Sequence, residues 1–531
     1  MEKTDKSKGE SLSPPAIELS NISKAFGAVQ ANDKVSMSVT KGTIHGIVGE
    51  NGAGKSTLMS ILYGFYEADS GTTAINGQTV RIKNSNDAIA AGIGMVHQHF
   101  MLVETFSVLE NVMLGAESGA ILDKSIDDAR AELTRLEDEY GLHINPDSLA
   151  GELPVGEQQR VEILKALYRG AHILILDEPT GVLTPQETDQ LFSILNALKD
   201  EGVTIILITH KLREIMAVTD TVSVMRRGAM VAHRKTSETS KEELAELMVG
   251  RKVRLDIDKK SPNLGKVMLS ASDLSVTDRH GVVRVDNVGL EVRAGEIVGV
   301  AGVSGNGQSE LLDVLSGIRN PGQGRINING REITPDQPCD PASMREMKLN
   351  HVPEDRHKLG LVTAFDARES IILGYHDSPK YNGAVLMDYK AINDDCNHMM
   401  DAFDVRPRDP SLKSANFSGG NQQKLILARE MSKKPEVLLV GQPTRGVDIG
   451  AIEFIHNQLV AMRDAGCAVL LISVELEEIL ALSDRVLVMF EGRIVGEILP
   501  EDADERTLGL MMANALSDTD VPSKINPKAS V

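Results

Sequence analysis

A glycine-rich segment near the start of the chain has the residue types and spacing of a phosphate-binding loop. It reads Gly49-Glu50-Asn51-Gly52-Ala53-Gly54-Lys55-Ser56-Thr57, which fits the pattern G-x-x-x-x-G-K-[ST]. Glycines let backbone N–H groups surround phosphates, and the positive end of the following helix adds to the attraction. The segment therefore predicts a nucleoside triphosphate site, with Lys55 on the β- and γ-phosphates and Ser56 on Mg²⁺.

Two carboxylates follow an apolar run further along the first half of the chain. Residues 173–176 form a short apolar stretch that predicts a buried strand, and Asp177 and Glu178 come directly after it. At a strand tip beside a phosphate loop, Asp177 can bind Mg²⁺ and Glu178 can polarise the water that attacks the γ-phosphate. The alternative is an ordinary acidic turn, which the apolar run and the upstream loop disfavour.

The same series of motifs occurs twice along the chain. Residues 42–49 are echoed by residues 295–302, and Gln-Gln-Arg at 158–160 recurs as Gln-Gln-Lys at 422–424. The order of the motifs is preserved while their offset changes only from 253 to 264 residues. A period this long predicts the duplication of a whole domain and excludes a solenoid of short repeats.

The second copy lacks the charged groups of the first. Gln308 stands at the lysine position of the phosphate loop, and Gly441 and Gln442 stand at the positions of the two carboxylates. These changes remove the phosphate-binding cation, the metal ligand and the water-activating group. The second site is therefore predicted to be impaired, either holding nucleotide without turnover or standing empty.

Together these motifs resemble the ATP-binding subunit of ABC transporters. The resemblance also includes Gln98 after Gly-Met-Val-His, His210 after an apolar strand, and Phe-Ser-Gly-Gly-Asn-Gln-Gln-Lys at 417–424, which matches the family signature with Phe for its leading Leu. It covers nearly the whole chain. It implies an α/β fold of two tandem P-loop NTPase domains, each with a RecA-like α/β core, an α-helical subdomain and an antiparallel β subdomain.

The resemblance also implies roles for individual residues. Gln98 would sense Mg²⁺ and contact a membrane subunit, His210 would contact the γ-phosphate, and Phe26 would stack on adenine, although its residue type alone favours a core position. The implied cofactors are ATP and Mg²⁺. The catalytic residues would be Glu178, His210 and Gln98, the metal ligands Ser56, Gln98 and Asp177, and the signature contacts Ser418, Gly419, Gly420 and Gln422.

The signature is intact only in the second half. In the first half its place is taken by Leu-Pro-Val-Gly-Glu at 153–157, where Pro154 removes a hydroxyl and a backbone donor and Val155 adds bulk. In the family, two nucleotide domains pair head to tail, so that each site combines one domain's phosphate loop with the other's signature. The resemblance therefore implies one competent ATPase site, which joins the first loop to the second signature.

Strand and helix patterns alternate around these motifs. Runs rich in β-branched residues at 44–48, 173–176, 203–208 and 222–225 predict strands, and the apolar positions of 158–168 share one helix face. The expected domain plan is a disordered N-terminus at 1–15, a first domain at 16–250, a linker at 251–266, a second domain at 267–516 and a disordered C-terminus at 517–531.

Composition limits the partners and the location of the chain. The 531 residues are too many for one core, and a net charge of −20 with 3% aromatic residues argues against a nucleic-acid partner. Three dispersed cysteines form no C-x-x-C pattern, which argues against zinc and disulfides. No apolar run approaches the roughly 18–20 residues of a membrane span, so we expect the chain to stay in the cytosol. The resemblance implies a peripheral protein at the cytoplasmic face of the inner membrane.

Finer motifs at residues 301–310, 352–358, 442–448 and 451–456 resemble the nucleoside-import branch of the family. The chain would then drive uptake of a nucleoside or a related simple sugar through separate channels. A ribose/galactose-type importer is the alternative, although that branch usually keeps acids at the positions of Gly441 and Gln442. A soluble ribosome-associated tandem ATPase is a remote alternative, disfavoured by the short linker and the altered second site.

The expected partners are two integral membrane permease subunits and, indirectly, an external substrate-binding lipoprotein. The permeases would be contacted near Gln98 and the apolar segment from Phe100 to Leu109. An ordinary core of the helical subdomain explains this apolar segment equally well.

Overall fold

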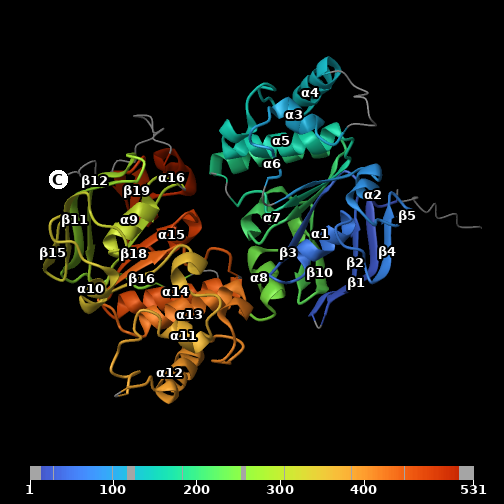
Figure 1. Ribbon diagram of the computed structural model, residues 1–531. Helices are drawn as coiled ribbons and strands as arrows, with labels where there is room; N and C mark the ends of the chain where they lie inside the picture. Colours follow the sequence, from blue (N-terminus) through green and yellow to red (C-terminus); the bar gives the residue numbers. More distant parts are fainter. Residues whose placement is uncertain are drawn as a thin grey trace, which may run out of the picture. The chain divides into compact units, whose positions relative to one another are not determined.

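The computed structural model of the chain consists of two compact units, unit 1 (Met1–Val253) and unit 2 (Arg254–Val531). It describes residues 14–27, 29–97, 100–116, 126–181, 183, 185–252, 257, 259–303, 305–383, 385–447 and 449–512. Figure 1 shows that each unit contains two sheets with helices packed around them. The α/β fold expected from the sequence is confirmed in both units.

A six-stranded sheet in the order β10-β9-β3-β8-β7-β6 forms the centre of unit 1. All its neighbouring strands are parallel except β10, which pairs antiparallel with β9 at the edge. β3 and β8 are buried along their whole length, as expected for parallel strands with both faces covered. The strands are β3 (Ile44–Gly49), β6 (Ile93–Val96), β7 (Ile173–Asp177), β8 (Thr204–Ile208), β9 (Thr221–Arg226) and β10 (Ala229–Lys235).

The four strands predicted from β-branched runs correspond to β3, β7, β8 and β9. Each predicted boundary lies within one residue of the observed one. Short apolar runs bounded by turn residues were sufficient here because these strands are buried on both faces.

An antiparallel sheet in the order β2-β1-β4-β5 forms the second layer of unit 1. Buried residues of β1, including Ile17 and Leu19, share one core with Leu58 and Met59 of the helix that follows the phosphate loop. This packing fixes the sheet beside the loop. The strands, labelled in Figure 1, are β1 (Ile17–Phe26), β2 (Val29–Val39), β4 (Ser70–Ile75) and β5 (Gln78–Val80).

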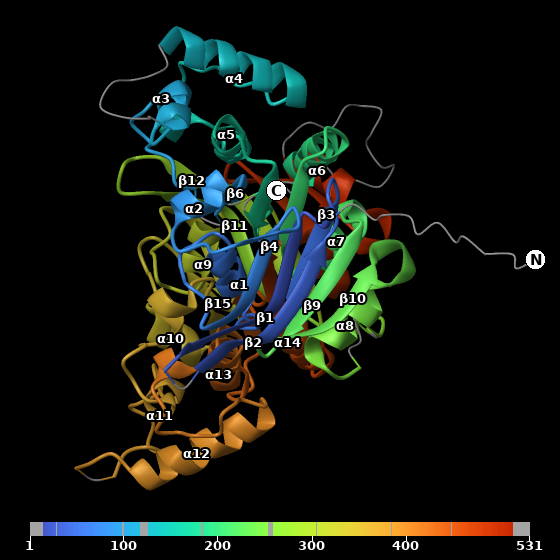
Figure 2. The same cartoon turned by 90° about the vertical axis from the view of Figure 1, so that its right-hand side faces the viewer.

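The helices α3, α4 and α5 gather at one end of unit 1 in both views (Figures 1 and 2). They make up the helical part of the unit, with α3 and α4 packed on α5. The helices of unit 1 are α1 (Lys55–Leu62), α2 (Ser85–Ala90), α3 (Val108–Met113), α4 (Ile126–Tyr140), α5 (Val155–Tyr168), α6 (Pro185–Asp200), α7 (Leu212–Val218) and α8 (Lys241–Val249), with short turns η1 (Ala150–Glu152) and η2 (Thr236–Glu238).

Unit 2 repeats this topology. Its central sheet has the order β16-β17-β18-β13-β19-β20 and its antiparallel sheet the order β12-β11-β14-β15. The strands are β11 (Val267–Thr277), β12 (Val283–Arg293), β13 (Ile297–Ala301), β14 (Gln323–Ile328), β15 (Arg331–Ile333), β16 (Leu349–Val352), β17 (Val437–Gly441), β18 (Ala468–Ser473), β19 (Arg485–Phe490) and β20 (Arg493–Ile498).

The helical group of unit 2 consists of α11, α12 and α13. The helices of this unit are α9 (Gln308–Leu315), α10 (Pro341–Glu346), α11 (Ala367–Ile371), α12 (Tyr389–Ala402), α13 (Gly419–Met431), α14 (Ile449–Asp464), α15 (Leu476–Leu482) and α16 (Glu505–Met512). Short turns are η3 (Arg356–Gly360), η4 (Ser414–Asn416) and η5 (Pro500–Asp502). In the part of the chain that the structure describes, no helix is both long and apolar enough to cross a bilayer.

The end of the predicted linker packs on unit 2. The ammonium group of Lys259 donates to the backbone oxygens of Leu482 and Ser483, and Arg463 donates to the backbone oxygen of Lys260 at 2.9 Å. The side chain of Arg463 is fully buried and forms an ion pair with Asp484 at 2.9 Å. These contacts hold residues 259–260 against unit 2 before β11 begins.

Candidate active site

The phosphate loop of unit 1 connects the buried strand β3 to α1. Gly52 and Gly54 have φ angles of 79° and 97°, in the left-handed region that glycine adopts without strain. A side chain at Gly54 would also run into the backbone oxygen of Ala31. The loop therefore keeps the close backbone turn that presents N–H groups to phosphates.

Lys55 is folded back across this loop. Only 6% of the residue is exposed, and its ammonium donates to the backbone oxygens of Gly49 at 2.7 Å and Glu50 at 3.2 Å. Burial lowers the pKa of Lys55, and the nearby carboxylates of Glu178 and Asp177 oppose that shift. The cation thus lies at the loop that the sequence predicted it would serve.

Asp177 ends β7 beside the loop. Its carboxylate is hydrogen-bonded to the Ser56 side chain, while burial and the neighbouring Glu178 raise its pKa. Ser56 is exposed, and Asp177 is partly buried. A hydroxyl and a carboxylate are oxygen ligands of the kind that Mg²⁺ prefers, so these two residues fit the predicted metal site.

Glu178 occupies a turn with φ of 50°, an uncommon conformation for a residue with a side chain. Its backbone N–H donates to the oxygen of Ile208 at 2.9 Å, which ties the turn to the end of β8. Its Oε2 lies 2.8 Å from Nδ1 of His210, two residues beyond β8. The predicted base and the predicted γ-phosphate contact therefore lie together.

Phe26 ends β1 with 43% of its surface exposed. Its ring meets the ring of Tyr66 edge to face, with 5.0 Å between centroids and 71° between planes. Tyr66 is 44% exposed and was not singled out from the sequence, because nothing in its local pattern distinguishes it from a loop residue. Two accessible rings in contact offer more stacking surface than the single ring predicted.

Gln98 lies outside the described residues, but the segment that follows it is described. The backbone N–H of Met101 donates to Glu162 at 2.8 Å, and Lys165 donates to the backbone oxygen of Met101 at 3.2 Å. Met101 and Phe106 are exposed, whereas Val108 and Leu109 are buried. The segment from Phe100 to Leu109 is therefore exposed near its start and buried at its end.

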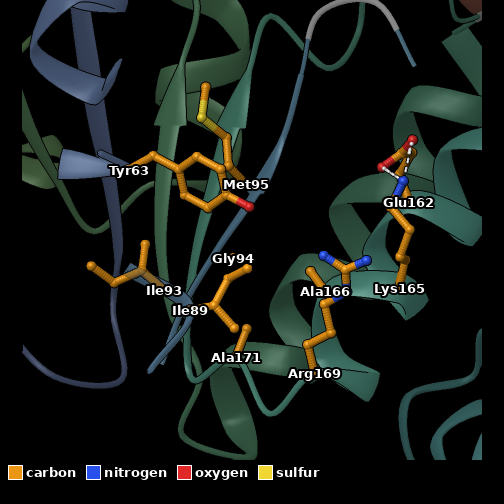
Figure 3. A pocket seen from close by; sticks show the side chains of 10 residues that line it. All are labelled: Tyr63, Ile89, Ile93, Gly94, Met95, Glu162, Lys165, Ala166, Arg169 and Ala171. Atoms are coloured by element: carbon orange, nitrogen blue, oxygen red, sulfur yellow. Dashed lines mark hydrogen bonds and ion pairs between the residues drawn. The ribbon is translucent and has the colours of Figure 1, made fainter. Parts of the chain in front are cut away.

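A pocket adjoins this segment between the sheet and α5 (Figure 3). Tyr63 lies on one side, and Lys165 and Arg169 of α5 lie on the other. Lys165 forms an ion pair with Glu162 at 2.9 Å. The lining is Tyr63, Ile89, Ile93, Gly94, Met95, Glu162, Lys165, Ala166, Arg169 and Ala171.

The signature residues lie at the start of α13 in unit 2. Ser418 caps the helix, its hydroxyl accepting the N–H of Asn421 at 3.4 Å, whereas Pro154 at the same place in unit 1 provides no side-chain cap. Gln422 is 5% exposed, and its amide binds the backbone oxygen of Ser414 and the ring of His357. The side chain of Gln422 thus bonds to Ser414, which precedes the signature, and to His357. Its predicted contact with nucleotide stays a prediction.

Unit 2 keeps the backbone of the site without its acid–histidine pair. Gln442 has φ of 47°, and its N–H donates to Ile472 at 2.8 Å, as Glu178 donates to Ile208. Its side-chain oxygen accepts the backbone N–H of Val474 at 3.2 Å. The turn is therefore the same in both units, and in unit 2 a neutral amide stands at the position of the predicted base.

The chain matches the family described as ABC transporter twice, over residues 32–181 and 285–445. It is 45% identical over 93% of its length to the "Nucleoside import ATP-binding protein NupA" of Lactococcus lactis, covering 97% of that protein. It is 46% identical over 94% to the "Guanosine import ATP-binding protein NupO" of Bacillus subtilis, covering 97%. The "Glucose import ATP-binding protein TsgD13" of Haloferax volcanii is 44% identical over 94% of the chain and is covered to 96%.

One solved structure, an archaeal ribosome recycling factor bound to a ribosomal stalk protein, has the same fold. It covers 88% of this chain and 87% of its own, with a TM-score of 0.57 and 18% identity. The two matched regions contain the phosphate loops and the strand-tip residues of both units. The chain belongs to the ABC transporter family, and it is an ATPase that carries two of the family's ATP-binding domains in tandem.

Proposed function

We propose that this chain is the motor subunit of an importer and couples ATP hydrolysis to the uptake of a nucleoside through separate permeases. The observation that carries the proposal is the difference between the units. Unit 1 has a lysine in its phosphate loop and a glutamate paired with a histidine, whereas unit 2 has an intact signature without these groups. A single competent site that combines the lysine and the glutamate–histidine pair of unit 1 with the signature of unit 2 accounts for both observations.

The residues of unit 1 account for the hydrolytic step. Lys55 would leave the loop carbonyls for the β- and γ-phosphates, which compensate for its burial better than neutral oxygens do. Glu178 would take the proton of the attacking water, and His210 would hold that carboxylate while it contacts the γ-phosphate. Ser418, Gly419 and Gly420 would complete the phosphate contacts, and Phe26 would stack on the adenine.

Ser56, Asp177 and Gln98 are the proposed ligands of Mg²⁺. When bound there, the ion would neutralise charge that develops on the phosphates. The hydrogen bond between Ser56 and Asp177 already brings two of these oxygen donors together. Gln98, two residues after the end of β6 in the sequence, would be the third ligand.

The permease subunits are proposed to dock at the pocket of Figure 3 and the exposed start of the Phe100 to Leu109 segment. The Glu162–Lys165 pair binds both backbone groups of Met101, so movement of this segment would be transmitted to α5. The chain would then lie at the cytoplasmic face of the inner membrane, with a substrate-binding lipoprotein on the other side. The proposed domain limits are those expected from the sequence.

Nucleosides are the proposed cargo because two of the three relatives named above are called nucleoside or guanosine importers. The third is called a glucose importer, so a simple sugar is the second candidate. Uptake of labelled guanosine, ribose and glucose in a strain lacking this chain tests both. Loss of guanosine uptake alone supports the proposal, and loss of sugar uptake alone contradicts it.

A further inference from the structure

The turn that carries Glu178 is held by side chains of two other elements of unit 1. The hydroxyl of Thr180, two residues after Glu178, donates to Oε1 of Glu214 on α7. The amide of Gln159 on α5 donates to the backbone oxygen of Pro179 at 2.9 Å. The three side chains that form these bonds are buried, so water competes little for them.

The carboxylate of Glu214 also lies beside the segment that carries His210. Burial raises the pKa of Glu214, whereas Lys211 and the hydroxyls of Thr180 and Thr209 oppose the rise. Thr209 comes directly before His210 and is fully buried. One side chain therefore meets both of the segments that present the predicted base and the predicted γ-phosphate contact.

In unit 2 the corresponding glutamate has a different partner. Glu478 stands at the position of Glu214, at the offset of 264 residues, and its Oε1 lies 2.9 Å from Nε2 of His456 on α14. Among the described residues, its Oε2 has no hydrogen-bond partner. Unit 1 has Phe192 at the position of His456, and a phenylalanine ring cannot form this bond. The glutamate of unit 2 is therefore bound to α14, and that of unit 1 to the turn.

The glutamine contact differs between the units as well. Gln423 stands at the position of Gln159 and is also buried, but among the described residues its Nε2 has no hydrogen-bond partner. The backbone of the turn is nevertheless the same, with φ of 47° at Gln442 and 50° at Glu178. The turn therefore forms without the glutamine bond, and both differences occur in the unit that has lost the acid.

Restraining this turn restrains the carboxylate of Glu178. The carboxylate lies 2.8 Å from the ring of His210, on a residue with an uncommon backbone conformation. A general base must lie within hydrogen-bond reach of the proton that it takes, and a misplacement of about 1 Å can lower a rate about 100-fold. Bonds that hold the turn should therefore act on turnover more than on nucleotide binding.

We propose that Glu214 is a positioning residue for the hydrolytic step and acts through Thr180 on the carboxylate of Glu178. Gln159 restrains the same turn from α5, through the oxygen of Pro179. In this role Glu214 needs no contact with nucleotide, so its loss should lower kcat and leave the affinity for ATP unchanged. The inference rests on the proposed role of Glu178 as the base.

The test compares Thr180→Val, which removes the hydroxyl at nearly constant volume, with Thr180→Ser, which keeps it. Turnover of the full chain is measured by phosphate release and divided by the number of ATP-binding sites. Thr180→Val should lower kcat by at least about 10-fold and change KM for ATP by less than about twofold, because the base is displaced while the phosphate loop is intact. Thr180→Ser should retain most of the parent kcat, since its hydroxyl can still donate.

Changes at Glu214 test whether the two residues act through one bond. Glu214→Gln keeps an oxygen that can accept the hydroxyl of Thr180 and should retain most of the parent kcat. Glu214→Leu removes the acceptor and should lower kcat at least as much as Thr180→Val does, and adding Thr180→Val to it should cause no further loss. Thr444→Val, at the buried counterpart of Thr180 in unit 2, is the matched control and should turn over ATP at the parent rate.

Three results would overturn the proposal. They are parent kcat in Thr180→Val, equal losses in Thr180→Val and Thr444→Val, and losses that multiply when Thr180→Val and Glu214→Leu are combined. If Glu214→Leu does not fold, the two Thr180 variants and Glu214→Gln still decide the question. Turnover that survives Glu178→Gln would instead overturn the proposed base. A chain that Glu178→Gln inactivates and Thr180→Val does not would contradict only the role of Glu214.

Discussion

Nδ1 of His210 lies 2.8 Å from Oε2 of Glu178, although 32 residues separate them in the sequence. The two residues meet because β7 and β8 are parallel neighbours whose carboxyl ends share one edge of the sheet. In unit 2, the side-chain oxygen of the corresponding Gln442 accepts the backbone N–H of Val474 instead. At this position, therefore, unit 1 pairs a carboxylate with a histidine, and unit 2 does not.

Replacing Glu178 with Gln should abolish ATP turnover and leave ATP binding intact. The amide keeps the size of the carboxylate but cannot take a proton from water, and a general base contributes about 10²- to 10⁴-fold to such rates. Turnover is measured by phosphate release, and binding by a fluorescent ATP analogue.

Glu201→Gln is the matched control, because Glu201 is an exposed acid of unit 1 outside the site. It should turn over ATP at the parent rate. Substantial residual hydrolysis in the Glu178→Gln variant would show that a second site works, which would contradict the single-site assignment.

The two signatures should respond unequally to the same change. Gly419→Asp places a carboxylate in the intact signature of unit 2 and should lower kcat by about 100-fold or more, because it puts a negative charge where phosphate is expected. Val155→Asp at the counterpart in unit 1 should change kcat by less than about threefold, since the proposed competent site does not use that signature. Both rates are measured in the assembled transporter.

Equal losses from the two substitutions would mean that each unit uses its own signature. Each variant's ATP affinity and melting temperature are the controls. A Gly419→Asp variant that melts at the parent temperature but does not turn over is the result expected for a composite site.

The phosphate loop and the strand-tip acids could be predicted from the sequence because their chemistry is local. The loop needs glycines and a lysine in fixed order, and the acids follow an apolar run that forms a buried strand whatever its neighbours are. The same holds for the loss of charge at Gln308 and Gln442. Such features are encoded within ten residues, so one sequence is sufficient to recognise them.

Contacts between strands could not be predicted in this way. The bond between Ser309 and Glu354 joins residues 45 positions apart, and it depends on Gly441 leaving room on a third segment. Tyr66 beside Phe26 depends likewise on how α1 packs against the antiparallel sheet. These relationships are set by tertiary packing, which no local pattern in a single sequence records.

Removing the exposed ring of Phe26 should weaken ATP binding without slowing the chemical step. Stacking of a base on an aromatic ring contributes about 1–3 kcal/mol, so Phe26→Ala should raise KM for ATP roughly 5- to 150-fold at unchanged kcat. Phe26→Tyr should retain the parent KM. A fall in kcat with KM unchanged would show that the ring supports the fold of the loop instead of the adenine.

Charge placed on the proposed permease surface should uncouple the motor. Met101 is 64% exposed, and Met101→Asp would put a carboxylate on an apolar contact while its backbone stays bound to Glu162 and Lys165. We expect parent ATPase activity in the isolated chain, loss of co-purification with the permeases and loss of transport. Leu264→Asp, at an exposed position of unit 2, is the control and should retain both.

The buried cluster of His45, Thr221 and Ser223 should make unit 1 sensitive to acid. Both ring nitrogens of His45 lie 2.7 Å from hydroxyls, and burial, assisted by the nearby His233, lowers its pKa to about 4. Between pH 6.5, the ordinary pKa of a histidine, and about pH 4, the unfolded chain binds a proton that the folded chain does not. Stability should therefore fall as the pH drops through this range, by up to roughly 3 kcal/mol, and level off below it.

The variant that tests this prediction copies the corresponding residues of unit 2. It has Val298 and Leu487 where unit 1 has His45 and Ser223, so His45→Val/Ser223→Leu replaces the cluster with an apolar pair already tolerated by the same fold. In this variant, the protection of β3 peptides against hydrogen exchange should change much less between pH 6.5 and pH 4 than it does in the parent. Peptides of β16, where the pKa of His351 is also lowered to about 4 by burial, should keep theirs and serve as the internal control. If β3 in the variant still loses protection by the parent factor, then His233 or another group carries the acid sensitivity.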